Sequence, residues 1–104
     1  MNMLNSLILE GWVADEPSIV LVGNRQVLRF TVKTERLAVT EEGERVKEES
    51  HFPCEAYGVF TEEKFKKWFT DGQGIRLVGR LKQTVDSNVC IVCEHIEWKL
   101  GKKK

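Results

Sequence analysis

Residues 89–95 read VCIVCEH and place Cys90 and Cys93 at the C-x-x-C spacing, with His95 two positions further on. Such a cysteine pair binds zinc or exchanges disulfides when both sulfurs converge at a turn or a helix N-terminus. This stretch has no Gly or Pro, and its Val and Ile residues favour a strand, on which side chains three positions apart point to opposite faces. The pattern therefore predicts cysteines that pack as small apolar residues. A thiol or metal protein stays as the third functional alternative.

Other residue types that support catalysis are sparse. The chain has two His, and neither a G-x-S-x-G nor a P-loop sequence occurs in it. Carboxylates crowd into residues 35–50, which hold six Glu against two Arg and one Lys, a composition typical of a solvated surface segment. The third cysteine, Cys54, is predicted to point inward from a strand of its own. We therefore expect no enzymatic activity, no metal and no cofactor.

The elements that position these residues are predicted to be five strands and one helix. Apolar and polar residues alternate in the strands, most cleanly in VLRFTVKT. Asp15-Glu16-Pro17 is predicted to break the first strand, and the polar segment 37–50 to be a long exposed loop or a loose hairpin. In chain order we expect strands at 4–14, 27–34 and 51–57, a helix at 62–71, and strands at 75–84 and 89–98.

The predicted helix carries an apolar stripe. Thr61 is a suitable N-cap and Gly72 suits the position after the last turn. Phe65, Trp68 and Phe69 follow the helical spacing, and we expect this stripe to face the core rather than a ligand. The predicted core consists of Leu9, Phe30, Val32, Phe52, Phe65, Phe69, Leu77 and Leu81.

The chain as a whole has the size and composition of one globular domain, residues 1–104, with a basic C-terminal tail at 99–104. No apolar run approaches the about 20 residues that cross a membrane, and the start has no secretory signal pattern. Cysteines without such a signal favour a reducing compartment, so we expect a cytoplasmic, nucleoid-associated protein without membrane contact. The formal net charge is zero, which gives no overall electrostatic attraction to nucleic acid.

Five strands with one helix between the third and fourth are the order of the OB-fold, an all-β barrel that binds oligonucleotides. Four pieces of the chain carry a closer resemblance: NSLILEGWVADEP, LRFTVKTER, SHFPCEAYG and GIRLVGRL. They resemble, in the same order, the first, second, third and fourth strands of bacterial single-stranded DNA-binding proteins. The resemblance spans residues 5–98 and fits a short tailless member or a primosomal replication protein of the same fold.

This resemblance implies sequence-tolerant binding of single-stranded DNA in replication, recombination or repair, by stacking bases on aromatic side chains over a basic surface. Tyr57 stands where the family has a stacking Phe, and His51 where it has a Trp. Trp12 stands where the family usually has Asn, so it is either a further stacking platform or a packing or subunit-contact residue. The implied nucleic-acid-binding residues are Trp12, Arg29, Thr31, Lys33, His51, Tyr57, Arg76, Arg80 and Lys82.

Several departures from the family keep a second hypothesis open. The 37–50 segment is acidic and has no aromatic residue, the last hairpin is short, and the family's acidic tail tip has no counterpart. We therefore expect weaker binding, or an OB-fold interaction or assembly module that has lost nucleic acid. Family members pair through the first strand, which implies a homodimer or homotetramer that uses Ile8, Glu10 and Trp12. Replication or repair proteins are the implied protein partners, and the choice between DNA and RNA stays open.

Overall fold

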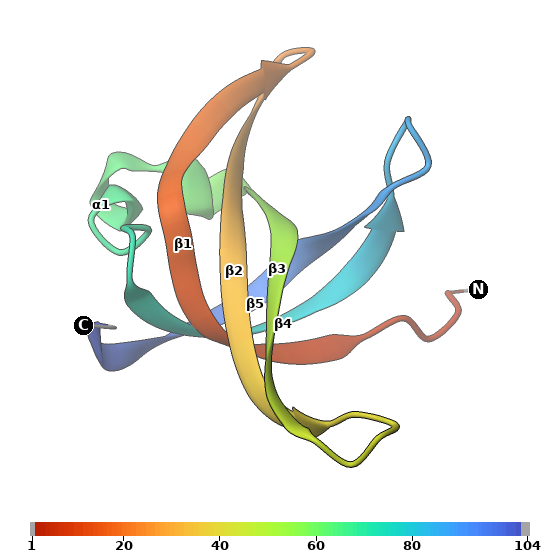
Figure 1. Ribbon diagram of the computed structural model, residues 1–104. Helices are drawn as coiled ribbons and strands as arrows, with labels where there is room; N and C mark the ends of the chain where they lie inside the picture. The colour runs from red at the N-terminus through yellow and green to blue at the C-terminus, as the bar shows by residue number, and fades with distance from the viewer. Residues whose placement is uncertain (1, 103–104) are drawn as a thin grey trace.

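The structure is a computed structural model that describes residues 2–102, with the backbone alone for residues 64 and 100–102. Five strands close into one barrel in the order β1-β2-β3-β5-β4 (Figure 1). Neighbouring strands are antiparallel, except for the short parallel contact of β3 with β5. This confirms the predicted five-stranded all-β fold. The strands are β1 (Leu7–Val22), β2 (Arg25–Val39), β3 (Arg45–Tyr57), β4 (Gln73–Gln83) and β5 (Val89–Lys102).

The predicted break at Asp15-Glu16-Pro17 is wrong, because β1 continues through these residues to Val22. The strand absorbs them as a register shift between Ala14 and Ser18, and Asp15 adopts a φ of 63° there. A bulge of this kind bends a strand without ending it. The bend allows β1 to pair with β4 over residues 7–12 and with β2 over residues 12–22.

The predicted segment 37–50 is a hairpin rather than a loop. Strand β2 continues to Val39 and β3 begins at Arg45, so only Thr40–Glu44 form the turn. The two strands pair in register along this whole ribbon, which projects from one end of the barrel (Figure 1). The loose-hairpin alternative is therefore confirmed, with longer strands than the sequence pattern indicated.

The predicted helix at 62–71 is wrong in extent. A 3-10 turn covers Gly58–Thr61 and α1 covers only Glu63–Lys66, still between β3 and β4 as predicted. Thr61 does not cap the helix, because its hydroxyl donates to the Gly58 carbonyl at 2.7 Å. The chain then docks on β1 through a hydrogen bond from the Gly72 amide to the Val13 carbonyl, 2.7 Å. Contacts with the barrel therefore replace the later helical turns.

The core lies inside the barrel and is covered at one end by the 58–72 segment. Of the predicted core residues, Phe30, Val32, Phe69 and Leu77 are buried. Leu9, Phe52 and Phe65 are half-buried and pack against the same cluster. Leu81 is the wrong prediction: it is 50% exposed, at the end of β4 that leaves the barrel to form a hairpin with β5.

An aromatic stack connects this core with the surface. The Phe30 and Phe69 rings lie 4.9 Å apart, and Trp98 contacts Phe69 edge-on at 4.7 Å. Trp68 stacks on the outer side of Trp98 at 5.7 Å and is 38% exposed. The predicted inward stripe therefore holds for Phe69 and Phe65 but not for Trp68. Among the described residues, no helix has both the length and the apolar character needed to cross a membrane.

Phe30 anchors this stack, and we expect Phe30→Ala to lower the free energy of unfolding by about 3–5 kcal/mol, because the variant leaves a cavity in a closed core. Chemical denaturation measures the change. Val85→Ala is the matched control, since Val85 is fully exposed and its truncation should change stability by no more than about 0.5 kcal/mol. A similar loss in both variants would contradict the assigned core.

Candidate nucleic-acid interface

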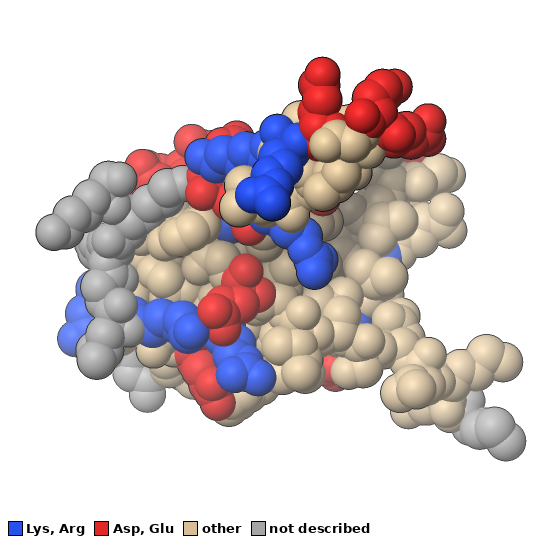
Figure 2. Space-filling view, turned by 60° about the horizontal axis from the view of Figure 1, so that its bottom comes forward, with Lys and Arg blue, Asp and Glu red and all other residues tan. Residues whose placement is uncertain are grey.

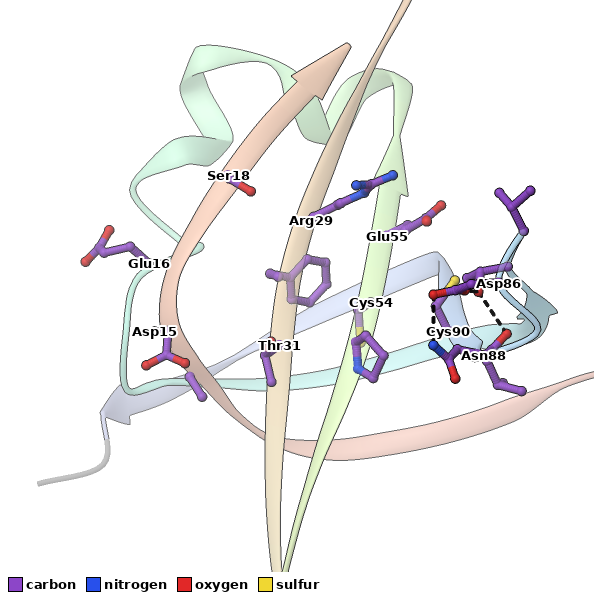
Figure 3. Close-up of a pocket in the computed structure, with 16 residues that line it drawn as sticks. Asp15, Glu16, Ser18, Arg29, Thr31, Cys54, Glu55, Asp86, Asn88 and Cys90 are labelled. Atoms are coloured by element: carbon purple, nitrogen blue, oxygen red, sulfur yellow. Dashed lines mark hydrogen bonds between the residues drawn. The ribbon is translucent and has the colours of Figure 1, made fainter. Parts of the chain in front are cut away.

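A groove of about 650 Å³ crosses one face of the barrel (Figure 3). Its walls come from the β1 bulge, the middle of β2 and β3, and the β4–β5 hairpin. Two predicted site residues, Arg29 and Thr31, line it, and Arg29 is paired in register with Glu55 of β3. The alternation of β2 directs both side chains away from Phe30 and Val32, and two residues of the core, Phe30 and Cys54, also line the groove. The groove also contains the acidic side chains of Asp15, Glu16, Glu55 and Asp86.

Tyr57 and Lys82, two further predicted residues, are not among the residues that line this groove, but both contact Glu55, which lines it. The Tyr57 hydroxyl donates a short hydrogen bond to the Glu55 carboxylate. The Lys82 ammonium donates to the same hydroxyl at 3.3 Å and lies 3.6 Å from the Glu55 carboxylate. The guanidinium of Arg25 lies over the Tyr57 ring, 5.3 Å from its centre. The Tyr57 hydroxyl and the Lys82 ammonium therefore meet at one carboxylate, and a second cation, Arg25, lies over the ring.

The Glu55 carboxyl is ionised although it is buried. Burial opposes ionisation of this carboxyl, but the hydrogen bond from Tyr57 and the charge of Lys82 outweigh it, so its pKa lies below the usual value. The same contacts, first with Tyr57 and then with Glu55, raise the pKa of Lys82. The cluster is therefore an ionised pair with a tyrosine hydroxyl between the two charges.

A second, smaller hollow of about 370 Å³ contains three other predicted residues, Trp12, Lys33 and His51. Trp12 is paired in register with Lys33, and Lys33 with His51, so the three come from adjacent positions on β1, β2 and β3. Trp12 is half-buried and His51 is exposed. The structure therefore brings a ring from β1 and an imidazole from β3 to either side of Lys33.

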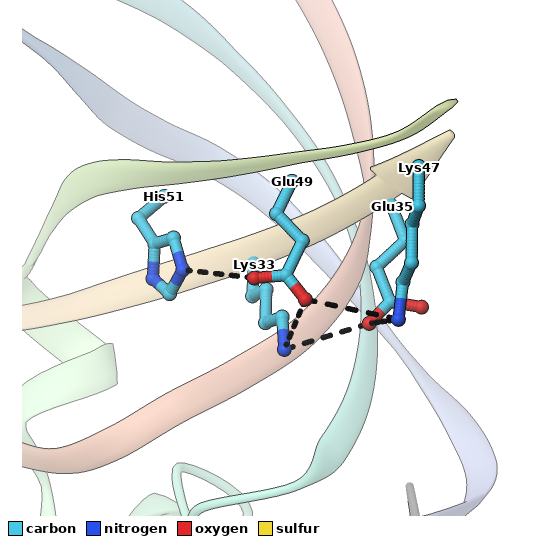
Figure 4. Close-up of polar contacts among 5 residues, drawn as sticks. All are labelled: Lys33, Glu35, Lys47, Glu49 and His51. Atoms are coloured by element: carbon cyan, nitrogen blue, oxygen red, sulfur yellow. Dashed lines mark ion pairs between the residues drawn. The ribbon is translucent and has the colours of Figure 1, made fainter. Parts of the chain in front are cut away.

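The positive charge of Lys33 is offset within the protein. Its ammonium lies 3.4 Å from the Glu35 carboxylate and 3.2 Å from that of Glu49 (Figure 4). Glu35 and Glu49 are directly opposite each other on the two strands, and Lys47 bridges both from the other side at 3.2 and 3.7 Å. The hydrogen bond and the charge of Lys33 lower the pKa of Glu49. Like charges across a ribbon repel, so the two lysines stabilise this pairing.

Two predicted residues lie elsewhere. Arg76 is paired with Glu10 on one side and Glu97 on the other, on the outer surface of β1, β4 and β5. Arg80 is exposed opposite Val92 and is not among the residues that line either hollow. On the face shown in Figure 2, Lys and Arg side chains lie beside Asp and Glu side chains. The basic surface predicted from the sequence is therefore divided by carboxylates.

The cysteines are packing residues of the barrel. Cys93 belongs to the core cluster, whereas Cys90 lines the groove beside Glu55, so the two sulfurs face different surroundings. A hydrogen bond with Cys54, and then burial, raise the pKa of Cys93; burial, and then the Glu55 charge, raise that of Cys90. The reactive and metal-binding thiolate form is thus disfavoured. No three His, Cys, Asp or Glu side chains gather to hold a metal within the described part of the chain.

Residues 4–89 match the model of the single-strand binding protein family. The chain belongs to this family. No curated protein sequence matches the chain significantly.

Solved structures of single-strand binding proteins share the fold of this family member. A Plasmodium falciparum protein solved in complex with ssDNA superposes with a TM-score of 0.77 at 19% identity, covering 95% of this chain and 97% of the other. The small single-stranded DNA-binding protein of Streptomyces coelicolor gives 0.71 at 18% identity, covering 95% and 96%. The wild-type Thermus aquaticus protein gives 0.76 at 21% identity, where the match covers 94% of this chain and 51% of that one.

In this family member, the groove residue Glu55 and Arg25, which lies over the Tyr57 ring, are not among the residues predicted from the sequence. Glu55 shares the strand face of Tyr57 and His51, so the alternation of β3 was the signal that could have found it. Arg25 lies at the start of β2, where it is paired with Val22 of β1, and it reaches Tyr57 because Val27, two residues further on, is the partner of Tyr57 on β3. Sequence alternation alone does not give that register.

All three thiols are free and buried, and we expect them to react with an aromatic disulfide reagent only after the barrel opens. Labelling of the native protein should be about a hundredfold slower than that of the unfolded chain, because a buried thiol becomes accessible only through local unfolding. Absorbance at increasing denaturant follows the reaction. A thiol that reacts in the native protein as fast as free cysteine would contradict the packing role.

Proposed function

We propose that the chain binds single-stranded DNA without sequence preference, on the face that carries the 650 Å³ groove. The observation that supports this most is the cluster beside the groove residue Glu55, in which Arg25 lies over the Tyr57 ring and Lys82 contacts the Tyr57 hydroxyl. An aromatic ring flanked by cations is the arrangement that single strands require, since every base has a π-face and every linkage a phosphate. Membership of the single-strand binding protein family supports the same proposal.

In the proposed mechanism a base stacks on Tyr57 while the adjacent phosphates contact Arg25, Arg29 and Lys82. Stacking of this kind contributes about 1–3 kcal/mol per base. Thr31 supplies a hydroxyl to the groove beyond Arg29, on the side away from Tyr57. The neighbouring hollow with Trp12 and His51 extends the path of the strand along β2 and β3. Binding of this kind makes and breaks no covalent bond, so the proposed activity is not enzymatic.

A second candidate function, an interaction or assembly module without nucleic acid, is favoured by the carboxylates on this face. Lys33 and Lys47 are each paired with both Glu35 and Glu49. The groove itself contains Asp15, Glu16, Glu55 and Asp86. A module of this kind would show no salt-sensitive binding of oligo-dT even at low ionic strength, which separates the two candidates.

The biological setting is part of the proposal. We propose a role in replication, recombination or repair, at the nucleoid, with single-stranded DNA rather than RNA as the principal ligand and replication or repair proteins as partners. We also propose a homodimer or homotetramer through the outer face of β1, where Ile8 is 62% exposed. Glu10 on that face is paired with Lys99 at 3.0 Å. Sedimentation at high micromolar concentration measures the assembly.

For the stacking step, we expect Tyr57→Ala to weaken oligo-dT binding by about 1–3 kcal/mol, because the variant loses the ring on which a base stacks. The salt dependence of binding should stay nearly unchanged, because the variant removes no phosphate contact. Fluorescence anisotropy of a labelled oligo-dT at several salt concentrations gives both quantities. Trp68→Ala is the control for loss of an exposed ring outside the groove. Equal weakening by both variants would contradict the assigned platform.

For the phosphate contacts, Arg29→Ala should lower the slope of log affinity against log salt by about 0.7, the value for one contact with a single strand. We expect Lys33→Ala to change the slope less, because Glu35 and Glu49 already offset its charge. The same titration shows which of the two variants has the larger change in salt slope. A larger change for Lys33→Ala would place the strand on the ribbon instead of the groove.

A further inference from the structure

Glu55 is a buried carboxylate in a groove that we propose for a polyanion. The residue is 8% exposed, and its neighbours keep it ionised. By charge alone, a carboxylate at this place repels the phosphates of a strand and weakens binding. The contacts of Glu55 with its neighbours indicate the opposite effect on binding.

The carboxylate is the fixed point of the cluster. The Glu55 backbone is paired with Arg29 of β2 on one side and with Val92 of β5 on the other, so strands hold it from both directions. Its side chain is 10% exposed, whereas that of Lys82 is 47% exposed. The Glu55 carboxylate is buried and held between two strands, so it restricts the long, exposed side chain of Lys82. Lys82 in turn has little effect on the position of Glu55.

Two groups take their positions from this point. The Tyr57 hydroxyl donates to the carboxylate, and the Lys82 ammonium lies 3.6 Å from it. Lys82 is 3.3 Å from the Tyr57 hydroxyl but 5.9 Å from the ring centre, so the ammonium is at the hydroxyl end of the ring and not above its middle. The guanidinium of Arg25 lies over the ring at a shorter distance, 5.3 Å. The ring orientation and the ammonium position are therefore coupled through one carboxylate.

We propose that Glu55 is the positioning residue of the strand-binding face: its carboxylate anchors the Tyr57 hydroxyl and the Lys82 ammonium, so that a stacking ring and a phosphate-binding cation are held at a fixed spacing. This inference rests on the proposed function. The proposal predicts that the Glu55 carboxylate strengthens strand binding, whereas repulsion between its charge and the phosphates would weaken binding.

The sign of the effect provides the test. Glu55→Gln removes the charge and keeps an amide oxygen, while Glu97→Gln makes the same change in net charge at an exposed site beside Arg76, away from the groove. We expect Glu55→Gln to bind labelled oligo-dT about three- to tenfold more weakly than the wild type, a loss in the lower part of the range seen for coupled residues in one hydrogen-bonded network. The salt slope should fall as Lys82 loses its position. Glu97→Gln should bind as tightly as the wild type or slightly more tightly.

Tyr57→Phe provides a second variant that keeps the ring and removes only the hydroxyl. It should also weaken binding, and Glu55→Gln should weaken binding less in the Tyr57→Phe background than in the wild type. Thermal melts of each variant separate this coupling from a loss of folding, and Tyr57→Phe keeps the test open if Glu55→Gln unfolds.

Three outcomes overturn the proposal. If Glu55→Gln binds as tightly as Glu97→Gln or more tightly, or if its effect is the same in the Tyr57→Phe background, Glu55 is not a positioning residue and the proposed function stands. If the wild type itself shows no salt-sensitive binding, the proposed function fails and the positioning role fails with it.

Discussion

Closure of the barrel depends on two points where backbones approach without room for a side chain. A Cβ atom on Gly11 would lie 2.2 Å from the Lys33 carbonyl oxygen, and one on Gly79 would lie 2.5 Å from that of Val92. Gly11 lies where β1 changes its partner from β4 to β2, and Gly79 where β4 shifts register against β5. Any larger residue would separate these strands, because the obstructing atoms are backbone and cannot rotate away.

The site follows from this closure. Once β1 has joined β2 and β4, the remaining edges of β3 and β5 meet in a short parallel contact, Cys54 with Ile91 and Glu55 with Val92. That contact brings Lys82, on the strand next to β5, within 3.3 Å of the Tyr57 hydroxyl on β3. A ring and a cation far apart in the sequence thus share one carboxylate. Strand pairing therefore gathers cations locally in a chain whose net charge is zero, beside a groove that also contains carboxylates.

The chain order of the strands and the face of each side chain could be predicted from the sequence, because period-two alternation marks the strands and reports which side chains share a face. It placed Phe30 and Val32 in the core and Arg29, Thr31 and Tyr57 outside. What alternation does not contain is register and long-range docking. The ion pairs of Lys33 depend on Glu35 lying opposite Glu49, and Arg25 reaches Tyr57 only through the pairing of a longer β2. The length of the helix was overestimated, because local sequence signals do not contain the long-range contact between Gly72 and Val13 that ends it.

The central claim is that a single strand lies across the groove face, against Tyr57 and its cations. The most direct measurement is a heteronuclear NMR titration of the labelled protein with oligo-dT at low ionic strength. Amide shifts should change at Arg29, Thr31, Glu55, Tyr57 and Lys82, and little around Glu10, Arg76 and Glu97 on the outer surface. Shift changes confined to that outer surface, or the absence of any change at saturating oligo-dT, would contradict the account.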